Sequence, residues 1–204
     1  MSIETNNMKI GLVIMASGLS KRFGRNKLME ALNGKPLIKW TIDATDALFD
    51  GRVVVTRNSD VRDLCDEFCV DCIMHELPNR NDTIRLGLTA LMDSVDYCFF
   101  MPGDQPLISR QSIINLINEA KKHGDRIIRA SFGDTCGMPV GFPKTLFSDL
   151  LNLPEKKGGS FVVKNNLSLV DLVELSDKYE LFDVDTEDDL EALKGILKTK
   201  ENRL

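Results

Sequence analysis

The sequence has neither an excess of basic residues nor a long hydrophobic run, and each absence excludes a class of protein. Its 204 residues carry 26 Lys and Arg against 31 Asp and Glu, a formal net charge of −5. Such a chain has no global positive field to hold duplex nucleic acid or an anionic membrane, so any phosphate must be bound locally. No apolar run approaches the roughly 18 residues that span a bilayer. We therefore expect no nucleic-acid partner and no membrane partner.

The sequence also lacks the signs of an exported protein. Residues 1–7, MSIETNN, are polar and acidic rather than basic and apolar, so we expect a disordered end and not a signal or transit peptide. The five cysteines are an odd number without the spacing of a disulfide framework, which is typical of a reducing compartment. A cytoplasmic protein is therefore expected.

The order of the hydrophobic patterns predicts an α/β fold. The runs Ile10–Met15 and Tyr97–Met101 are continuous and apolar, as in strands that are buried on both faces. Helical patterns separate them from further strand-like runs, of which 181–184 is the last, and Thr186-x-x-Asp189 forms a capping box before a final helix. Strands joined by helices imply three α/β/α layers around a mainly parallel central sheet.

Ligands bind beyond the carboxyl ends of the strands in such sheets, so the loop at residues 16–27 is a candidate site. It has two glycines and four cations, and it can offer backbone N–H groups and positive charge to a polyphosphate. The four cations are Lys21, Arg22, Arg25 and Lys27. The loop is not a P-loop, because five residues separate Gly18 from Gly24, and the dinucleotide motif G-x-G-x-x-G is absent. The alternative interpretation is a solvated basic turn.

This loop resembles that of a known family. Its sequence, IMASGLSKRFGRNKL, resembles the signature L-A-A-G-x-S-x-R-M-G-x-x-K of the nucleotidyltransferases that activate sugars, isoprenoid precursors and molybdopterin. The fixed positions are matched by Gly18, Ser20, Arg22, Gly24 and Lys27, and the departures are Met15, Ser17 and Phe23. The resemblance implies that this loop, including Ala16 and Ser17, wraps a nucleoside triphosphate. It also implies that Arg22 and Lys27 hold the phosphates and act in catalysis.

A second loop follows the buried strand that ends at Met101. Asp104 projects there as a hard oxygen ligand, suited to a Mg²⁺ ion that bridges phosphates, or it caps the turn before Pro106. The stretch Gly103–Leu107, GDQPL, resembles the molybdenum cofactor cytidylyltransferases, whereas the guanylyl branch more often has C-D-x-P. The resemblance implies that Gly103 contacts the nucleotide and that Asp104 is a catalytic metal ligand. It favours CTP over GTP.

A third motif precedes the last helix. Residues Phe182–Leu190 resemble the D-I-D-T-P-E-D-L segment of the same branch, with Glu187 in place of the proline. The resemblance implies that Asp185 is a second metal ligand, with Asp183 as the neighbouring candidate, and the alternation of a strand would point both to one face. The alternative is a group of carboxylates favoured by the dipole of the following helix.

Two weaker motifs concern the base and the acceptor. The stretch Asn81–Leu88 resembles S-S-L-R-x-G-L, which implies that Asp82 and Thr83 lie near the nucleotide base, although either residue is also an ordinary helix N-cap. The turn Gly137-Met138-Pro139 resembles the G-H-P or G-N-P turn on the pterin side, so Gly137 and Pro139 are implied acceptor-binding residues. The missing His or Asn leaves the acceptor's identity open.

A competing signal comes from three cysteines. Cys65, Cys69 and Cys72 have the C-x₃-C-x₂-C spacing of enzymes that hold an iron–sulfur cluster. Cys65 and Cys69 are one helical turn apart, however, without a loop that would let three thiolates converge. We expect small buried hydrophobic residues here and interpret His75 and His123 as bystanders.

By these resemblances the chain is identified as a Mg²⁺-dependent nucleotidyltransferase with a Rossmann-like fold, similar to the molybdenum cofactor cytidylyltransferases. The implied reaction transfers CMP from CTP to molybdopterin with release of pyrophosphate, and a molybdenum hydroxylase is the implied recipient. We expect one domain over residues 1–204, in which 8–131 bind the nucleotide and 132–200 form the acceptor side and the closing elements. A monomer or small homo-oligomer is expected. The alternatives are a guanylyl or sugar-phosphate nucleotidyltransferase and a non-catalytic carrier or chaperone of the molybdenum cofactor.

Overall fold

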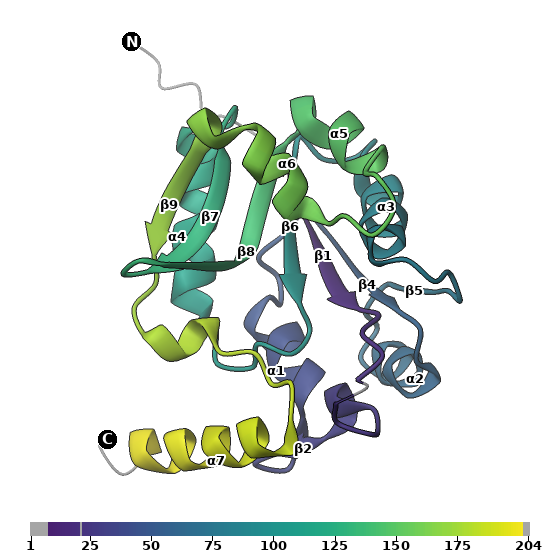
Figure 1. Ribbon diagram of the computed structural model, residues 1–204, viewed down its shortest axis with the longest axis vertical. Helices are drawn as coiled ribbons and strands as arrows, with labels where there is room; N and C mark the ends of the chain where they lie inside the picture. The colour runs from purple at the N-terminus through teal and green to yellow at the C-terminus, as the bar shows by residue number, and fades with distance from the viewer. Residues whose placement is uncertain (1–7, 21, 202–204) are drawn as a thin grey trace.

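A seven-stranded sheet forms the centre of the molecule (Figure 1). The computed structural model describes residues 8–20 and 22–201, so the expectation for residues 1–7 lies outside the described part, as does Lys21. The strands lie in the order β5-β4-β1-β6-β8-β7-β9. Their bounds are β1 Ile10–Ala16, β4 Gly51–Thr56, β5 Cys72–Met74, β6 Tyr97–Pro102, β7 Ile127–Phe132, β8 Thr135–Pro143 and β9 Val170–Glu174. A small separate sheet pairs β2 Ala31–Leu32 with β3 Lys35–Pro36.

The sheet is mainly parallel, as the sequence predicts. The strands β5, β4, β1 and β6 pair in parallel, and so do β7 and β9. Of the seven described strands of this sheet, β8 runs against its neighbours, β6 and β7. The parallel strands β1, β4 and β6 therefore place their carboxyl ends along one edge, and the loops that follow them lie side by side.

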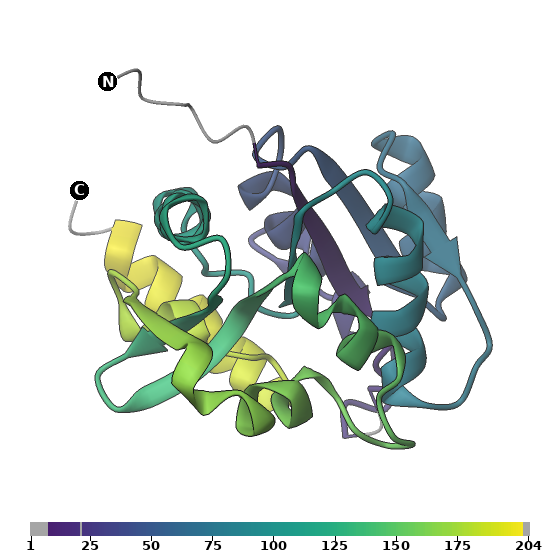
Figure 2. The same ribbon diagram turned by 90° about the horizontal axis from the view of Figure 1, so that it is seen from above.

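Helices cover both faces of the sheet, which confirms the three layers (Figure 2). One face is covered by α1 Leu37–Ala44, α2 Ser59–Glu67 and α4 Arg110–Lys122. The other is covered by α3 Arg80–Leu91, α5 Phe147–Leu151 and α6 Gly159–Asn165. Alternation along β1 separates the two cores, because Leu12 and Ile14 pack into the first and Val13 into the second. No helix in the described ranges is long and apolar enough to cross a membrane.

The last helix, α7 Glu187–Glu201, packs away from the main sheet, beside the small one (Figure 1). Leu190 and Leu193 on its apolar face form a third cluster with Leu32, Leu37 and Phe23. Phe23 belongs to the loop after β1 and is buried. This cluster therefore joins the first candidate loop to the C-terminal helix.

The strand expected at 181–184 is absent from the structure. The chain instead forms a 3₁₀ helix at Lys178–Leu181 and then runs without a ladder partner. After β9, which is the edge strand of the sheet, the chain crosses beyond the strand ends to reach α7. Residues 181–184 therefore have no neighbouring strand with which to pair. One backbone hydrogen bond fixes the crossing, from Val184 N–H to the carbonyl of Asp104 at 3.1 Å.

Two helical glycines give a matched test of the packing between α3 and the sheet. A Cβ added at Gly87 would lie 2.4 Å from Val13 Cγ1, whereas a Cβ at Gly195 on α7 would meet nothing within 4 Å. We expect Gly87→Ala to lower the free energy of unfolding by about 1–3 kcal/mol, because the helix must move away from β1. Gly195→Ala should leave it unchanged or raise it by up to about 1 kcal/mol, because alanine favours helix. Urea unfolding measures both, and equal stabilities of the two variants would contradict this close packing.

Candidate active site

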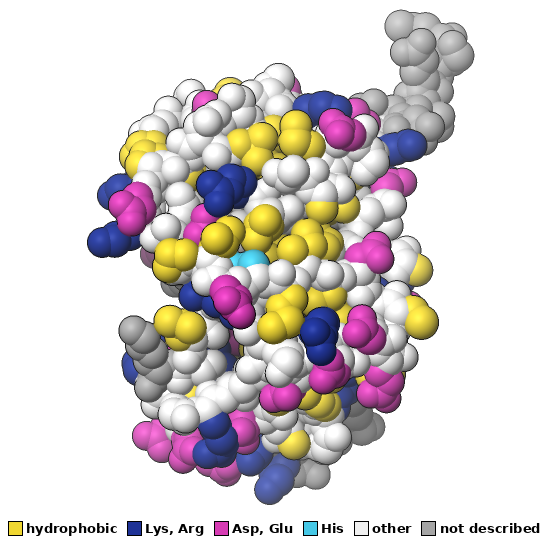
Figure 3. Space-filling model, turned by 90° about the vertical axis from the view of Figure 1, so that its right-hand side faces the viewer, with side chains coloured by type: hydrophobic (Ala, Val, Ile, Leu, Met, Phe, Trp, Pro, Cys, Tyr) yellow, Lys and Arg dark blue, Asp and Glu magenta, His cyan; other side chains and the backbone are white. Residues whose placement is uncertain are grey.

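A cavity of about 460 Å³ opens at the carboxyl ends of β1, β4 and β6. The space-filling view shows a hollow in this side of the molecule, with basic and acidic side chains near its rim (Figure 3). Its walls are formed by Met15, Ala16, Ser17, Gly18, Leu19, Ser20, Arg22, Lys27, Leu28, Arg57, Pro78, Thr83, Pro102, Asp104 and Asp185. The cavity thus combines the loop after β1 with the ends of two neighbouring strands and the segment before α7.

Ser20 organises the first loop. It has a positive φ of 46°, and its carbonyl accepts hydrogen bonds from the N–H groups of Phe23 at 2.9 Å and Gly24 at 3.1 Å. Its hydroxyl accepts from the N–H of Lys27 at 3.3 Å. Gly24 has a φ of 77°, a conformation that suits glycine. The tight turn therefore returns the chain to the cavity wall, where the short helix Lys27–Met29 begins.

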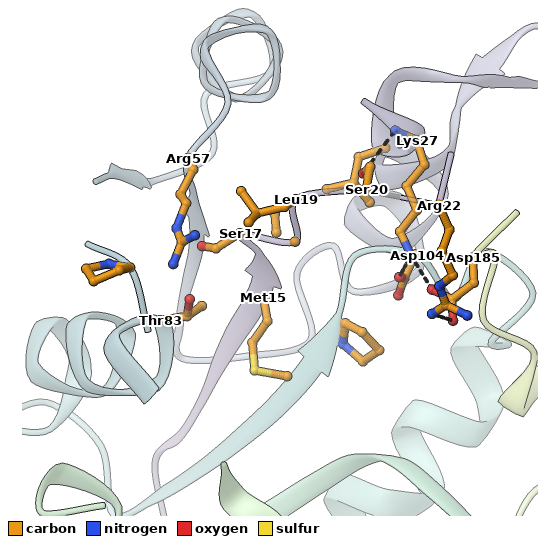
Figure 4. A pocket seen from close by; sticks show the side chains of 15 residues that line it. Met15, Ser17, Leu19, Ser20, Arg22, Lys27, Arg57, Thr83, Asp104 and Asp185 are labelled. Atoms are coloured by element: carbon orange, nitrogen blue, oxygen red, sulfur yellow. Dashed lines mark hydrogen bonds and ion pairs between the residues drawn. The ribbon is translucent and has the colours of Figure 1, made fainter. Parts of the chain in front are cut away.

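Lys27 lies between two carboxylates at one end of the cavity (Figure 4). The residue is only 7% exposed, and its ammonium nitrogen is 2.5 Å from Asp104 Oδ2 and 2.8 Å from Asp185 Oδ1. Arg22 contacts the other oxygen of Asp185, with 2.6 Å between Nη2 and Oδ2. Burial opposes the charge on Lys27, but the two carboxylates outweigh it and raise the pKa. The structure thus brings together all four residues predicted for the phosphates and the metal.

The capping box at the start of α7 holds Asp185 in place. Asp189 Oδ2 accepts hydrogen bonds from the N–H of Asp185 at 3.0 Å and of Thr186 at 2.8 Å, and Thr186 Oγ1 accepts from Asp189 N–H. The bond from Val184 to Asp104 fixes the same segment from the other side. Lys27 then lowers the pKa of Asp185 through a hydrogen bond and its charge. The sequence predicted this box as a helix cap, and the structure shows that it also positions a carboxylate.

The acidic end of the cavity suits a divalent cation. Asp104 Oδ1 is buried and has no hydrogen-bond partner among the described residues, so this oxygen is free to bind a ligand. Nearby, partial desolvation and then repulsion from Asp104 raise the pKa of Asp183 to about 6, although the residue keeps an exposed surface. Over the described ranges no three Asp, Glu, His or Cys side chains form a ready cluster for a metal. The donor set therefore fits Mg²⁺, which uses one or two carboxylates and takes its remaining oxygens from phosphates and water.

At the opposite end of the cavity, the lining residue Ser17 contacts a histidine whose role the sequence interpretation missed. His75 Nδ1 accepts from the N–H of Leu77 at 3.2 Å, so Nε2 carries the hydrogen and donates to Ser17 Oγ at 2.9 Å. The Ser17 hydroxyl donates in turn to the carbonyl of Val55 at 3.0 Å. His75 thus belongs to no metal-binding cluster among the described residues, and it positions Ser17 in the cavity wall. Its position directly after β5, at the same edge of the sheet, is the signal that could have found it.

The remaining predicted residues are less central. Thr83 lines the cavity, but the Asp82 carboxylate is occupied by the N–H of Asn79 at 3.0 Å and by Arg85 at 2.7 Å. The N-cap of α3 is Asn79, so the prediction of Asp82 or Thr83 as the cap is wrong. The helix begins earlier because Asn79 and Asp82 form a capping box.

Three glycines and a proline named by the sequence analysis are not part of the cavity wall. Gly24 lines a shallower hollow together with Arg22 and Thr186, and Gly103 directly precedes Asp104. Gly137 and Pro139 are on β8, where a Cβ at Gly137 would lie 2.7 Å from a methyl carbon of Leu181. Their role on the acceptor side stays a prediction.

The three cysteines do not form one cluster, although the thiols of Cys65 and Cys72 contact each other. Cys65 is buried in α2, Cys72 is partly buried in β5, and Cys69 lies exposed after the helix. The prediction of a buried residue is therefore wrong for Cys69, because α2 ends at Glu67 and the chain turns outward there. His123 lies on the surface near Glu119 of α4, outside the cavity. Over the described residues no site for an iron–sulfur cluster is present.

The buried contact of Lys27 can be tested through stability. Lys27→Met leaves the partly buried Asp104 carboxylate without its cation, and we expect the free energy of unfolding in EDTA to fall by about 3 kcal/mol. Lys194→Met, which removes a surface partner of Glu191, is the control and should change it by less than about 1 kcal/mol. Addition of Mn²⁺ should restore part of the loss in the first variant. If both variants unfold at the same urea concentration, Lys27 does not have this role.

Comparisons with known proteins show the family to which this chain belongs. The family model of the MobA-like NTP transferase domain matches residues 12–171. A protein of Natranaerobius thermophilus named probable molybdenum cofactor guanylyltransferase is 29% identical over 92% of this chain and 96% of its own length. A protein of the same name from Pyrococcus furiosus is 29% identical over 94% of this chain and 99% of its own.

Solved structures show the same fold. The Rv0371c protein of Mycobacterium tuberculosis H37Rv has a TM-score of 0.81 at 24% identity, over 92% of this chain and 98% of that one. Its manganese complex has a TM-score of 0.74 at 22% identity, with the same coverage of 92% and 98%. The chain therefore belongs to the family of the MobA-like NTP transferase domain, and it is a nucleotidyltransferase.

Proposed function

We propose that this nucleotidyltransferase moves GMP from GTP to a molybdopterin-type acceptor and releases pyrophosphate. The observation that carries the proposal is the cluster of Lys27, Arg22 and two carboxylates at one end of a cavity formed by strand ends. This cluster has the cations that phosphates need and the carboxylates that a divalent cation needs. Two relatives that match nearly the whole chain bear the name of a guanylyltransferase, which supports GTP as the donor.

The cavity has two chemically different ends, as a nucleotide does. Lys27, Arg22 and the carboxylates lie at one end, and Ser17, Arg57 and Thr83 lie at the other (Figure 4). The phosphates would lie at the first end and the base at the second. Ser17 would then belong to the wall around the base, and its hydrogen bonds with Val55 and His75 hold it there.

The proposed reaction needs no protein nucleophile. An oxygen of the acceptor's terminal phosphate attacks the α-phosphorus of the nucleotide, a new P–O bond forms, and the bond to the β-phosphate breaks. Lys27 and Arg22 hold the departing phosphates and stabilise the charge that builds up on them. Asp104 and Asp185 would hold Mg²⁺, with Asp183 beside them, and the bound ion would neutralise charge on the phosphates. Catalysis then consists of positioning and charge neutralisation.

A second candidate donor is CTP. The observation that favours it is the stretch Gly103–Leu107, which resembles the cytidylyltransferases at the loop that contains Asp104. The remaining parts of the proposal follow from the sequence expectations. Residues 8–131 bind the nucleotide and Gly137 and Pro139 lie on the acceptor side of one domain, with a molybdenum enzyme as the recipient of the product.

Loss of the Asp104 carboxylate should remove the activity and keep the fold. We expect Asp104→Asn to lower pyrophosphate release from GTP, in the presence of Mg²⁺ and a molybdopterin acceptor, by at least about 100-fold. The exposed Asp93→Asn is the control and should retain full activity. Near-UV circular dichroism checks the fold. An active Asp104→Asn would contradict the proposal, and a wild-type protein that binds the pterin but releases no pyrophosphate would indicate a carrier.

The donor can be identified by thermal stabilisation. A nucleotide that binds the folded chain raises the melting temperature according to its affinity and concentration. We expect GTP with Mg²⁺ to raise it more than equal concentrations of CTP, ATP or UTP. A larger rise with CTP would instead establish the second candidate donor.

A further inference from the structure

One arginine of the cavity wall, Arg57, belongs to none of the motifs found in the sequence. Arg57 directly follows β4 and lines the cavity. Figure 4 shows its guanidinium beside Ser17 and Thr83, at the end of the cavity away from Lys27 and Asp185. Among the lining residues it is the charged side chain at this end, and no ion pair joins it to Lys27, Asp104 or Asp185 in the described part of the chain.

Its hydrogen-bond donors are largely unused. Nη2 lies 3.5 Å from the carbonyl of Asn79, at the limit of a hydrogen bond. Nε is buried and has no acceptor among the described residues. A guanidinium has five N–H donors in one plane and keeps its charge in proteins, so a buried N–H without an acceptor is unfavourable. An acceptor on a bound ligand would remove this cost.

The hydrogen bonds of the neighbouring polar groups Ser17 and His75 do not involve Arg57. The Ser17 hydroxyl donates to Val55 and accepts from His75 Nε2, and His75 Nδ1 accepts from Leu77. Desolvation and the nearby positive charge of Arg57 also lower the pKa of His75, which favours its neutral form. These bonds fix one wall of the cavity, and the buried Nε of Arg57 has no acceptor among the described residues.

We propose that Arg57 recognises guanine through the two neighbouring acceptors O6 and N7. This assignment rests on the proposed function, which supplies GTP, and it adds the residue that selects the base. Planar N–H groups of arginine match this pair of acceptors, and the match is the most common specific contact between proteins and guanine in nucleic acids. Adenine presents an acceptor and an amino donor at the same edge, so the N6 amino group would face an N–H group of Arg57.

Replacement of one guanine acceptor tests the assignment without turnover. The measurement is the Kd of GTP and of 7-deaza-GTP, in which a C–H group replaces N7, with Mg²⁺ and without an acceptor substrate. We expect the wild-type protein to bind 7-deaza-GTP about tenfold more weakly than GTP. Arg57→Met should weaken GTP binding by a similar factor and bind both nucleotides equally. Arg62→Met removes an exposed arginine of α2 outside the cavity and should keep the wild-type ratio.

Two outcomes would overturn the assignment. One is a wild-type protein that binds GTP and 7-deaza-GTP equally, and the other is an Arg57→Met variant that keeps the wild-type ratio. Arg57→Leu also removes every donor of this side chain, so it should lose the discrimination as well, and it serves if the methionine variant does not fold. Pyrophosphate release from GTP by the wild-type protein tests the proposed function separately, because the Kd ratio needs no reaction.

Discussion

A buried ammonium group, that of Lys27, lies between two carboxylates and connects three parts of the chain that are far apart in the sequence. Lys27 begins the short helix after the first loop, Asp104 follows β6, and Asp185 precedes α7. Removal of one partner from such a contact leaves a buried charge without compensation, which is strongly unfavourable. The contact therefore determines how the loop, the sheet edge and the last helix meet, and the shape of the cavity depends on it.

The same arrangement explains how a small, acidic chain could bind highly charged substrates. In the proposed reaction the carboxylates of Asp104 and Asp185 would release Lys27 and bind a divalent cation. Lys27 would then bind the phosphates of the nucleotide. Every charge has a partner of opposite sign before and after the exchange, so no charge is left buried alone. The net charge of −5 thus includes a cationic loop and an acidic strand end that neutralise each other in the absence of substrate.

The parts that local sequence determines were the easiest to predict. Continuous apolar runs identified β1 and β6, and the rule that ligands bind at the carboxyl ends of strands located the loop at Ser17 and the turn at Asp104. The contacts that depend on tertiary packing were missed. The unpaired course of 181–184 depends on the lack of a neighbouring strand beyond β9, and the contact of His75 with Ser17 joins residues 58 positions apart. The free donors of Arg57 are visible only once the partners of its neighbours are known.

A crystal structure with a non-hydrolysable GTP analogue and Mn²⁺ would test the central claim most directly. The account predicts an anomalous peak within bonding distance of Asp104 Oδ1, with the Lys27 ammonium on the phosphates and the guanine beside Arg57. A nucleotide bound elsewhere, with Lys27 still between Asp104 and Asp185, would contradict it.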